Sequence, residues 1–221
     1  HLFPVPRRQA MDFQPTTLPS YSLLPLLPLL YAEMHHTLAG FSLIRRSWPE
    51  IVSDAPIRVE PGEPVPVLLL IKDAHRYPVV IEKVLVEMDG EGGYHRVESM
   101  IDGPLSVDSR WWTHFLELDP DLSAAGGGLR ISVRILARRA GRSRVREWIV
   151  DDYRGTSHAP LHVLLPCERL PSFPGWVFGD LHVHSDLTSD QVEFGAPIAA
   201  IARMAKAMGI AFTAVTDHSY D

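Results

Sequence analysis

Between residues 57 and 165 the chain alternates short apolar, β-branched and aromatic runs with turn signals, and this pattern constrains the fold more than any other feature. Along residues 129–136, aliphatic side chains alternate with arginine and serine, so the two sets fall on opposite faces of a strand. The sequence DGEGG at 89–93 supplies residues that tolerate positive φ, which indicates a hairpin. Several short strands at this spacing predict an antiparallel sandwich, immunoglobulin-like in outline.

The proline distribution divides the rest of the chain. Residues 1–56 are rich in proline, which forbids regular helix at this density, so we expect an irregular N-terminal segment. We then expect the β-sandwich domain at 57–165 and a linker at 166–175, where three prolines interrupt the β pattern. Residues 176–221 form the last predicted unit. The predicted strands of the sandwich lie at 65–71, 79–88, 94–97, 111–118, 129–136, 145–150 and 161–165.

The last unit has the pattern of a strand, a helix and a second strand. Residues 176–183 are strand-like, and 197–208 carry apolar residues at helical spacing between Pro197 and Gly209, which suit the two ends of a helix. Residues 210–216 are almost all apolar, as expected of a strand buried on both faces. A strand, helix and strand in this order predict two parallel strands joined by a right-handed crossover.

Potential metal ligands cluster at the carboxyl ends of these two predicted strands. His182 and His184 are two residues apart, so both imidazoles point to the same side of a strand and can reach one ion. Asp190 follows in the next loop, and His218 follows the second strand. Because parallel strands bring their carboxyl ends together, we expect His182, His184, Asp190 and His218 to converge as metal ligands.

The residue types limit which ion could bind. Imidazole and carboxylate groups suit Zn, Mn or Fe, and the single cysteine, Cys167, rules out a thiolate zinc site. Nitrogen and oxygen ligands without thiolates are typical of an open site that keeps a bound water, which is the catalytic kind. The formal net charge is −6, so we expect no nucleic-acid partner, because phosphate binding needs clustered lysine and arginine.

Two stretches resemble the PHP (polymerase and histidinol phosphatase) superfamily: GDLHVHSDLTSD at 179–190 and AKAMGIAFTAVTDHS at 205–219. The resemblance implies a distorted (βα)7 barrel with two or three metal ions, and hydrolysis of phosphate esters. His182 and His184 then match ligands of one metal, while Asp190 and His218 match residues that help to bind another. Asp180 and Asp217 match groups that hold the ligands by accepting their hydrogen bonds. The implied fold is mixed: an all-β sandwich followed by the first βαβ unit of the barrel.

Two functions follow. The first is a metal-dependent hydrolase, a phosphoesterase before other hydrolases, that uses metal-activated water on a small-molecule phosphate ester or other hydrolysable substrate. Since one βαβ unit cannot close a barrel, we expect residues 1–221 alone to bind metal weakly and to show no turnover. The alternative is a binding module, in which the sandwich recognises carbohydrate or protein beside a degenerate barrel. Trp111 and Trp112 could then stack on a sugar, although one core ring and one rim ring fit them better.

The sequence also bears on membranes and location. The apolar run at 18–30 is broken by prolines and is shorter than the ~20 residues that span a bilayer, so we expect no membrane segment. Because position 1 is His and Asp221 lies three residues after His218, we expect a longer parent protein, and a signal peptide can be neither recognised nor ruled out. The compartment and the oligomeric state stay open, with the cytoplasm slightly favoured.

Overall fold

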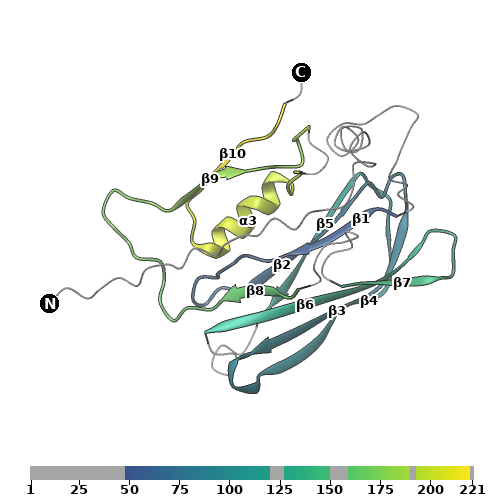
Figure 1. The fold of residues 1–221 in the computed structure, drawn as a ribbon, viewed down its shortest axis with the longest axis horizontal. Coiled ribbons are helices and arrows are strands. Elements are labelled where there is room, and N and C mark those ends of the chain that lie inside the picture. The colour runs from purple at the N-terminus through teal and green to yellow at the C-terminus, as the bar shows by residue number, and fades with distance from the viewer. Residues whose placement is uncertain (1–47, 120–126, 150–158, 190–192, 220–221) are drawn as a thin grey trace, which may run out of the picture.

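The computed structural model describes residues 48–119, 127–149, 159–189 and 193–219, and these residues form mostly antiparallel β-structure with a single helix (Figure 1). A short 3-10 turn, η1 (Glu91–Gly93), joins two of the long strands. The remaining elements, in chain order, are β1 (Glu50–Asp54), β2 (Val65–Lys72), β3 (Val79–Gly90), β4 (His95–Val107), β5 (Trp111–Leu118), β6 (Gly128–Arg139), β7 (Val145–Ile149), β8 (Leu161–Leu164), β9 (Gly179–Val183), α3 (Ile198–Met208) and β10 (Phe212–Val215).

Two antiparallel sheets make up the body of the molecule. One has the strand order β1-β2-β5, and the other has the order β4-β3-β6-β7. Strand β8 pairs with residues 128–131 of β6, while β7 pairs with residues 134–138 of the same strand. Both short strands therefore complete one long edge of β6.

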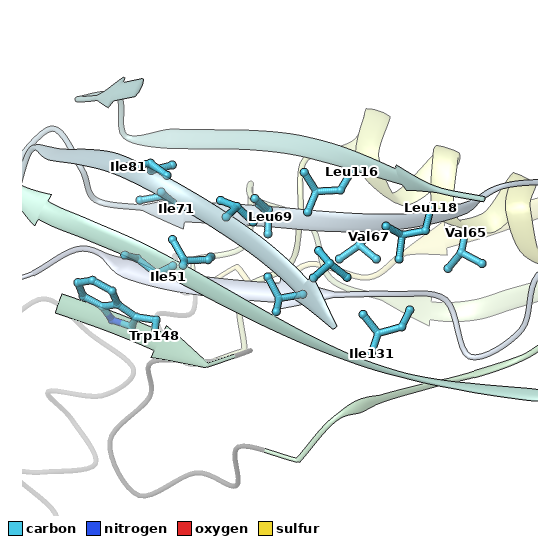
Figure 2. Close-up of a cluster of buried hydrophobic side chains, with 14 of the residues drawn as sticks. Ile51, Val65, Val67, Leu69, Ile71, Ile81, Leu116, Leu118, Ile131 and Trp148 are labelled. Atoms are coloured by element: carbon cyan, nitrogen blue, oxygen red, sulfur yellow. The ribbon is translucent and has the colours of Figure 1, made fainter. Parts of the chain in front are cut away.

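The core lies between these two sheets. Alternate side chains along the strands point inward, so that aliphatic residues from both sheets interdigitate (Figure 2). Trp148 on β7 closes one end of the core and makes an edge-to-face contact with Trp48, at 4.7 Å between ring centroids. The fully buried members include Ile51, Val65, Leu69, Ile71, Ile81, Leu118, Ile131 and Ile135.

Strand β2 is buried on both faces, which explains its almost continuous apolar sequence, VPVLLLIK. Val67 and Leu69 face the core between the sheets, whereas Leu68 and Leu70 belong to a second apolar cluster with Ala200 of α3. Partly buried side chains that pack against this second cluster are Trp111, Phe115, Phe194, Ala196 and Met204. Helix α3 therefore covers the outer face of the β1-β2-β5 sheet (Figure 1).

The predicted fold class is wrong. The described residues form one β-rich fold of mostly antiparallel sheet, not an all-β module followed by the first unit of a (βα)7 barrel. Strands β9 and β10 do pair in parallel with α3 between them. The helix, however, packs its buried face on β2 of the sandwich, because the apolar side chains of Leu68 and Leu70 supply the surface that it covers.

A pair of charged residues fixes the end of α3 to the sandwich. Arg58 forms an ion pair with Glu60 and donates a hydrogen bond to the carbonyl of Met208 at 3.2 Å. The backbone N–H of Glu60 donates to the carbonyl of Ala207 at 2.8 Å. Arginine here satisfies a terminal carbonyl of the helix and lies at the negative end of its dipole. The Glu60 carboxylate also accepts from the backbone N–H of Leu170, so the predicted linker is held at the same point.

Strand β1 lies inside the N-terminal segment that the proline content predicts to be irregular. Its sequence EIVSD is short and carries little alternation, so no period-2 signal marks it. The apolar run at 18–30 lies outside the described residues. Within the described part, no helix combines the length and apolar character needed to cross a bilayer.

Candidate metal centre

The imidazoles of His182 and His184 meet at the carboxyl end of β9. Their Nε2 atoms lie 3.2 Å apart and their ring centroids 5.1 Å apart. Both side chains project from the same side because they are two residues apart at the end of an extended strand. The predicted convergence of this pair is therefore present in the structure.

A backbone contact sets the tautomer of His184. Its Nδ1 lies 2.8 Å from the carbonyl oxygen of Glu193. A carbonyl can only accept a hydrogen bond, so Nδ1 carries the proton and, in the neutral ring, Nε2 carries a lone pair. A backbone carbonyl is one of the partners that commonly accept from the second ring nitrogen of a metal-ligating histidine. His184 is thus oriented with Nε2 available toward His182.

His218, which follows β10, lies against the same ring. Its centroid is 4.7 Å from that of His184, and its Nε2 donates a hydrogen bond to Glu193 Oε2 at 2.9 Å. One ligand atom from each of His184, Glu193 and His218 lies within 4.8 Å of the others. An ion with bonds of about 2.0–2.2 Å would need only small side-chain movements to bind all three.

Glu193 is the member of this group that sequence reasoning missed. The predicted carboxylate ligand, Asp190, lies outside the described residues, and Glu193 follows it by three positions in the same loop. The available signal was an acidic side chain in the loop that carries the predicted ligand, close to the histidines in sequence. The PHP-like motif instead predicts Asp190, the acidic residue at its end.

Asp180 and Asp217 hold the backbone near the histidines. Asp180 Oδ1 accepts from the backbone N–H of His182 at 3.0 Å. The two carboxylate oxygens of Asp217 accept from the N–H and the Oγ–H of Ser185, each at 2.6 Å, and Ser185 is fully buried. These contacts go to backbone and serine groups and not to the imidazoles, for which the acceptor role was predicted. The imidazoles of His184 and His218 instead lie against the carbonyl and the carboxylate of Glu193.

The pKa of Asp217 reflects these contacts. Burial alone would raise the pKa of this carboxyl group, but two hydrogen bonds from Ser185 and the electrostatic influence of the nearby His184 and His218 rings outweigh that effect and lower the pKa. The net result is a pKa below the ordinary aspartate value. Asp217 is therefore ionised at neutral pH and favours cations beside it.

Close backbone contacts tie the loop segments together. The N–H of Gly195 donates to the carbonyl of Ser185 at 3.1 Å, and a Cβ added at Gly195 would lie 1.5 Å from the carbonyl oxygen of His184. The N–H of His218 donates to Thr188 Oγ1 at 3.2 Å, and the N–H of Ser189 donates to the carbonyl of His218 at 2.9 Å. The loop after β9, the segment at 193–196 and the end of β10 therefore form one joined unit.

A second group with suitable donors lies on the β3–β4 hairpin, where Glu87, Asp89 and His95 approach one another. The His95 Nδ1 atom already lies 2.9 Å from Asp89 Oδ1, and Arg134 pairs with Glu87 at 3.4 Å. Arg130 also stands opposite Asp89 in the sheet register. Arg134 already supplies positive charge to Glu87, and His95 already contacts Asp89, so this group is the weaker candidate for a metal site.

The two tryptophans proposed as a stacking platform face opposite sides of β5. Trp112 packs against the core between the sheets, whereas Trp111 packs on Phe194, outside the sandwich. Adjacent residues of a strand point to opposite faces, so these rings cannot present one shared surface to a sugar.

Comparisons with known proteins identify no family for the chain. No family model and no curated protein matches it. A solved structure described as a protein from Archaeoglobus fulgidus is 13% identical, covers 46% of this chain and 91% of its own, and has a TM-score of 0.27. A likeness at that score supports no argument about fold or function, so the functional evidence is the group of His184, Glu193 and His218, with His182 beside His184.

Proposed function

We propose that the protein is a metal-dependent hydrolase, a phosphoesterase before other ester or amide hydrolases, acting on a small-molecule phosphate ester. The observation that carries the proposal is the approach of His184, Glu193 and His218 to within 4.8 Å, with His182 Nε2 at 3.2 Å from His184 Nε2. The likeness of residues 179–190 and 205–219 to PHP-superfamily motifs supports the same chemistry.

The donor set fits a divalent ion such as Zn, Mn or Fe. Two nitrogen ligands with bonds of about 2.0–2.1 Å lie roughly 3.3 Å apart in tetrahedral geometry, close to the 3.2 Å between the two Nε2 atoms. The histidines are neutral donors and Glu193 is an anionic one, a combination that these borderline metals accept. The described residues would hold one ion, with His184 and His218 supplying nitrogen and Glu193 supplying oxygen. His182, whose Nε2 lies beside that of His184, would add a nitrogen ligand after a movement of its side chain.

A divalent ion held there would polarise a phosphoryl oxygen and lower the pKa of a bound water. The protein residues would provide orientation and proton transfer. The carbonyl of Glu193 fixes the His184 ring. His218 Nε2 donates to the Glu193 carboxylate across 2.9 Å, and an ion bound by both groups would take the place of that proton. His182 is exposed, which leaves the side of the centre that it lines open to substrate and solvent.

Metal binding is the first test. The purified full-length protein, without chelators, should retain at least about one Zn, Mn or Fe per chain by plasma mass spectrometry, and His184→Ala in the same protein should lose it. His162→Ala is the matched control, because His162 is an exposed histidine on β8. Retention of metal by His184→Ala, or its absence from the wild-type protein with no uptake of added Zn, would overturn the proposal.

The reaction class needs a second test, on the full-length protein. We expect hydrolysis of bis(4-nitrophenyl) phosphate to exceed that of 4-nitrophenyl acetate, to stop on chelation and to return with added metal. Faster ester than phosphodiester cleavage would overturn the phosphoesterase assignment while leaving a metal-dependent hydrolase. Activity unchanged by chelation and by His184→Ala would contradict both.

A further inference from the structure

Glu193 is joined directly to a ring that packs on the outside of the sandwich. The next residue, Phe194, lies 5.6 Å from Trp111 of β5 between ring centroids, and the ammonium group of Lys72 on β2 lies 3.7 Å from the centre of the Phe194 ring. Lys72 also lies 3.6 Å from Glu50 Oε2 and 5.6 Å from the Trp111 ring. The Phe194 ring is thus held by an aromatic and a cationic group of one sheet.

On its other side the same segment contacts the histidines. The carbonyl of Glu193 accepts from His184 Nδ1, and its carboxylate accepts from His218 Nε2. Two residues later, Gly195 touches the backbone of His184. Residues 193–195 therefore contact the outer surface of the sandwich through Phe194 and the histidines through Glu193 and Gly195.

We propose that the outer face of the sandwich positions the metal centre: Trp111 and Lys72 hold Phe194, and Phe194 places Glu193 against His184 and His218. The inference rests on the proposed metal site and adds a role for the β-sandwich in it. Phe194, Trp111 and Lys72 are positioning residues, since none of them offers a ligand atom to the cluster.

The physical reason lies in the exposure of Glu193. Its side chain is exposed and lies in a loop, so without an anchor its many rotamers and the loop backbone would have to be ordered each time a metal binds. Because the Phe194 ring packs on the sandwich, the backbone of this loop is already ordered in the folded protein before a metal binds. Loss of an outer partner of a metal ligand typically weakens metal affinity by about 10–100-fold, and we expect a change of that size here.

The test compares two truncations in the same apolar cluster. Phe194→Ala removes the ring next to Glu193, and Met204→Ala removes a side chain that packs on the same outer face but belongs to α3 and not to the loop of Glu193. We expect Phe194→Ala to weaken Zn²⁺ binding by about 10–100-fold in a chelator-competition titration. Met204→Ala should leave the affinity within about twofold at a comparable loss in melting temperature, and Phe194→Tyr should restore binding.

A measurement on the metal-free protein separates this inference from the proposed function. Imidazole ¹⁵N spectra should show Nδ1 of His184 protonated and slowly exchanging in the wild-type protein and in Met204→Ala. Phe194→Ala should lose that signature. If the wild-type protein binds no Zn²⁺, the proposed function fails and these spectra still test the positioning role. Equal Zn²⁺ affinity and unchanged imidazole spectra in Phe194→Ala would overturn the inference itself. Should Phe194→Ala fail to fold, Trp111→Leu provides the same comparison.

Discussion

His182 and His184 hold their Nε2 atoms 3.2 Å apart, and the His184 atom carries a lone pair because Nδ1 of the same ring donates to a carbonyl. Two unprotonated nitrogens at this distance would repel each other. A proton on His182 or a cation between the rings removes the repulsion. The pair is therefore a place where a metal ion would replace a proton, which is how histidine metal sites couple to pH.

The first prediction concerns how much Zn²⁺ affinity the protein loses when His184 of this pair is removed. His184→Ala removes the ring that contacts His182, His218 and Glu193, so Zn²⁺ affinity should fall by more than the roughly 10–100-fold typical of outer partners. His162→Ala should bind like the wild-type protein. Isothermal titration with Zn²⁺ measures both, and a loss under about tenfold in His184→Ala would show that the ion binds elsewhere.

The second prediction concerns the buried contact between Ser185 and Asp217. Ser185→Ala removes one of two 2.6 Å hydrogen bonds to the carboxylate while the backbone N–H bond stays. The pKa of Asp217 should rise, because the lost bond favours the charged form, and the free energy of unfolding should fall by about 1–3 kcal/mol. Carboxyl ¹³C titration and urea unfolding measure these changes.

Ser106→Ala, at an exposed position on β4, is the control and should change neither the pKa of Asp217 nor the free energy of unfolding. An unchanged Asp217 pKa in Ser185→Ala would contradict the assignment of the serine bond as one cause of the lowered value.

Much of the strand pattern could be predicted because burial alternates along the strands. The run predicted at 129–136 lies within β6, whose buried residues alternate with exposed or half-buried ones, and the run at 65–71 matches β2 almost to the residue. Strand β1 gave no such signal. The continuous apolar sequence of β2 did carry information about a covered outer face, but it does not say which segment provides the cover.

The candidate site was predictable only in its local part. The positions of His182, His184 and His218 follow from strand ends in a parallel pair, a relation that the sequence pattern carries. The role of Glu193 depends on how the loop is pinned by Gly195 against His184 and by Phe194 against Trp111. These contacts join segments far apart in the chain, so neither spacing nor periodicity reports them. For the same reason the barrel prediction was wrong: the helix pattern specifies an apolar face and not its partner.

The third prediction uses two glycines with similar backbone angles. Gly209, at φ +78° after α3, would place a Cβ 2.6 Å from the Glu60 carboxylate, whereas Gly141, at φ +72°, has open space around it. Gly141→Ala should lower the free energy of unfolding by about 1 kcal/mol, because alanine is strained in the left-handed backbone conformation. Gly209→Ala should cost about 1–3 kcal/mol more, because the carboxylate that pairs with Arg58 must also move. If urea unfolding shows equal losses of stability in the two variants, the Glu60 side chain moves away from the new Cβ at the end of α3 without further loss of stability.

The fourth prediction concerns stability against pH. Burial alone would raise the pKa of Glu60, but hydrogen bonds from Arg58 and the Leu170 N–H, with the charges of Arg58 and Arg169, hold it below the ordinary glutamate value. A carboxyl whose pKa is lower in the folded state stabilises the fold above the unfolded pKa of about 4.3. That contribution disappears as the pH falls through the folded value.

Glu60→Gln should therefore lower the free energy of unfolding by about 2 kcal/mol near neutral pH, and the difference from the wild-type protein should shrink as the pH falls below about 4. Urea unfolding as a function of pH measures this. Glu63→Gln, at an exposed position nearby, should follow the wild-type curve throughout. A Glu60→Gln deficit that is independent of pH would assign the effect to packing rather than to charge.

The last prediction tests whether the backbone contact at Gly195 holds the metal centre together. A Cβ at this position would lie 1.5 Å from the His184 carbonyl oxygen and 2.9 Å from the Ser185 nitrogen, so Gly195→Ala must push the segment at 193–196 away from β9. Phe194 holds that segment on the sandwich, and the displacement at Gly195 therefore also changes the position of Glu193, which directly precedes Phe194 in the same segment. We expect Zn²⁺ affinity to fall at least about tenfold, as for loss of an outer partner of a metal ligand.

Gly127→Ala is the matched control, since a Cβ there meets nothing within 4 Å, and it should leave Zn²⁺ affinity unchanged. Gly195 lies outside the regular strands and the helix. Gly195→Ala should therefore keep a melting temperature close to that of the wild-type protein while its Zn²⁺ affinity falls. A variant that keeps full affinity would mean that Glu193 adapts freely to a moved backbone. In that case neither Gly195 nor Phe194 would position it, and the histidines alone would define the centre.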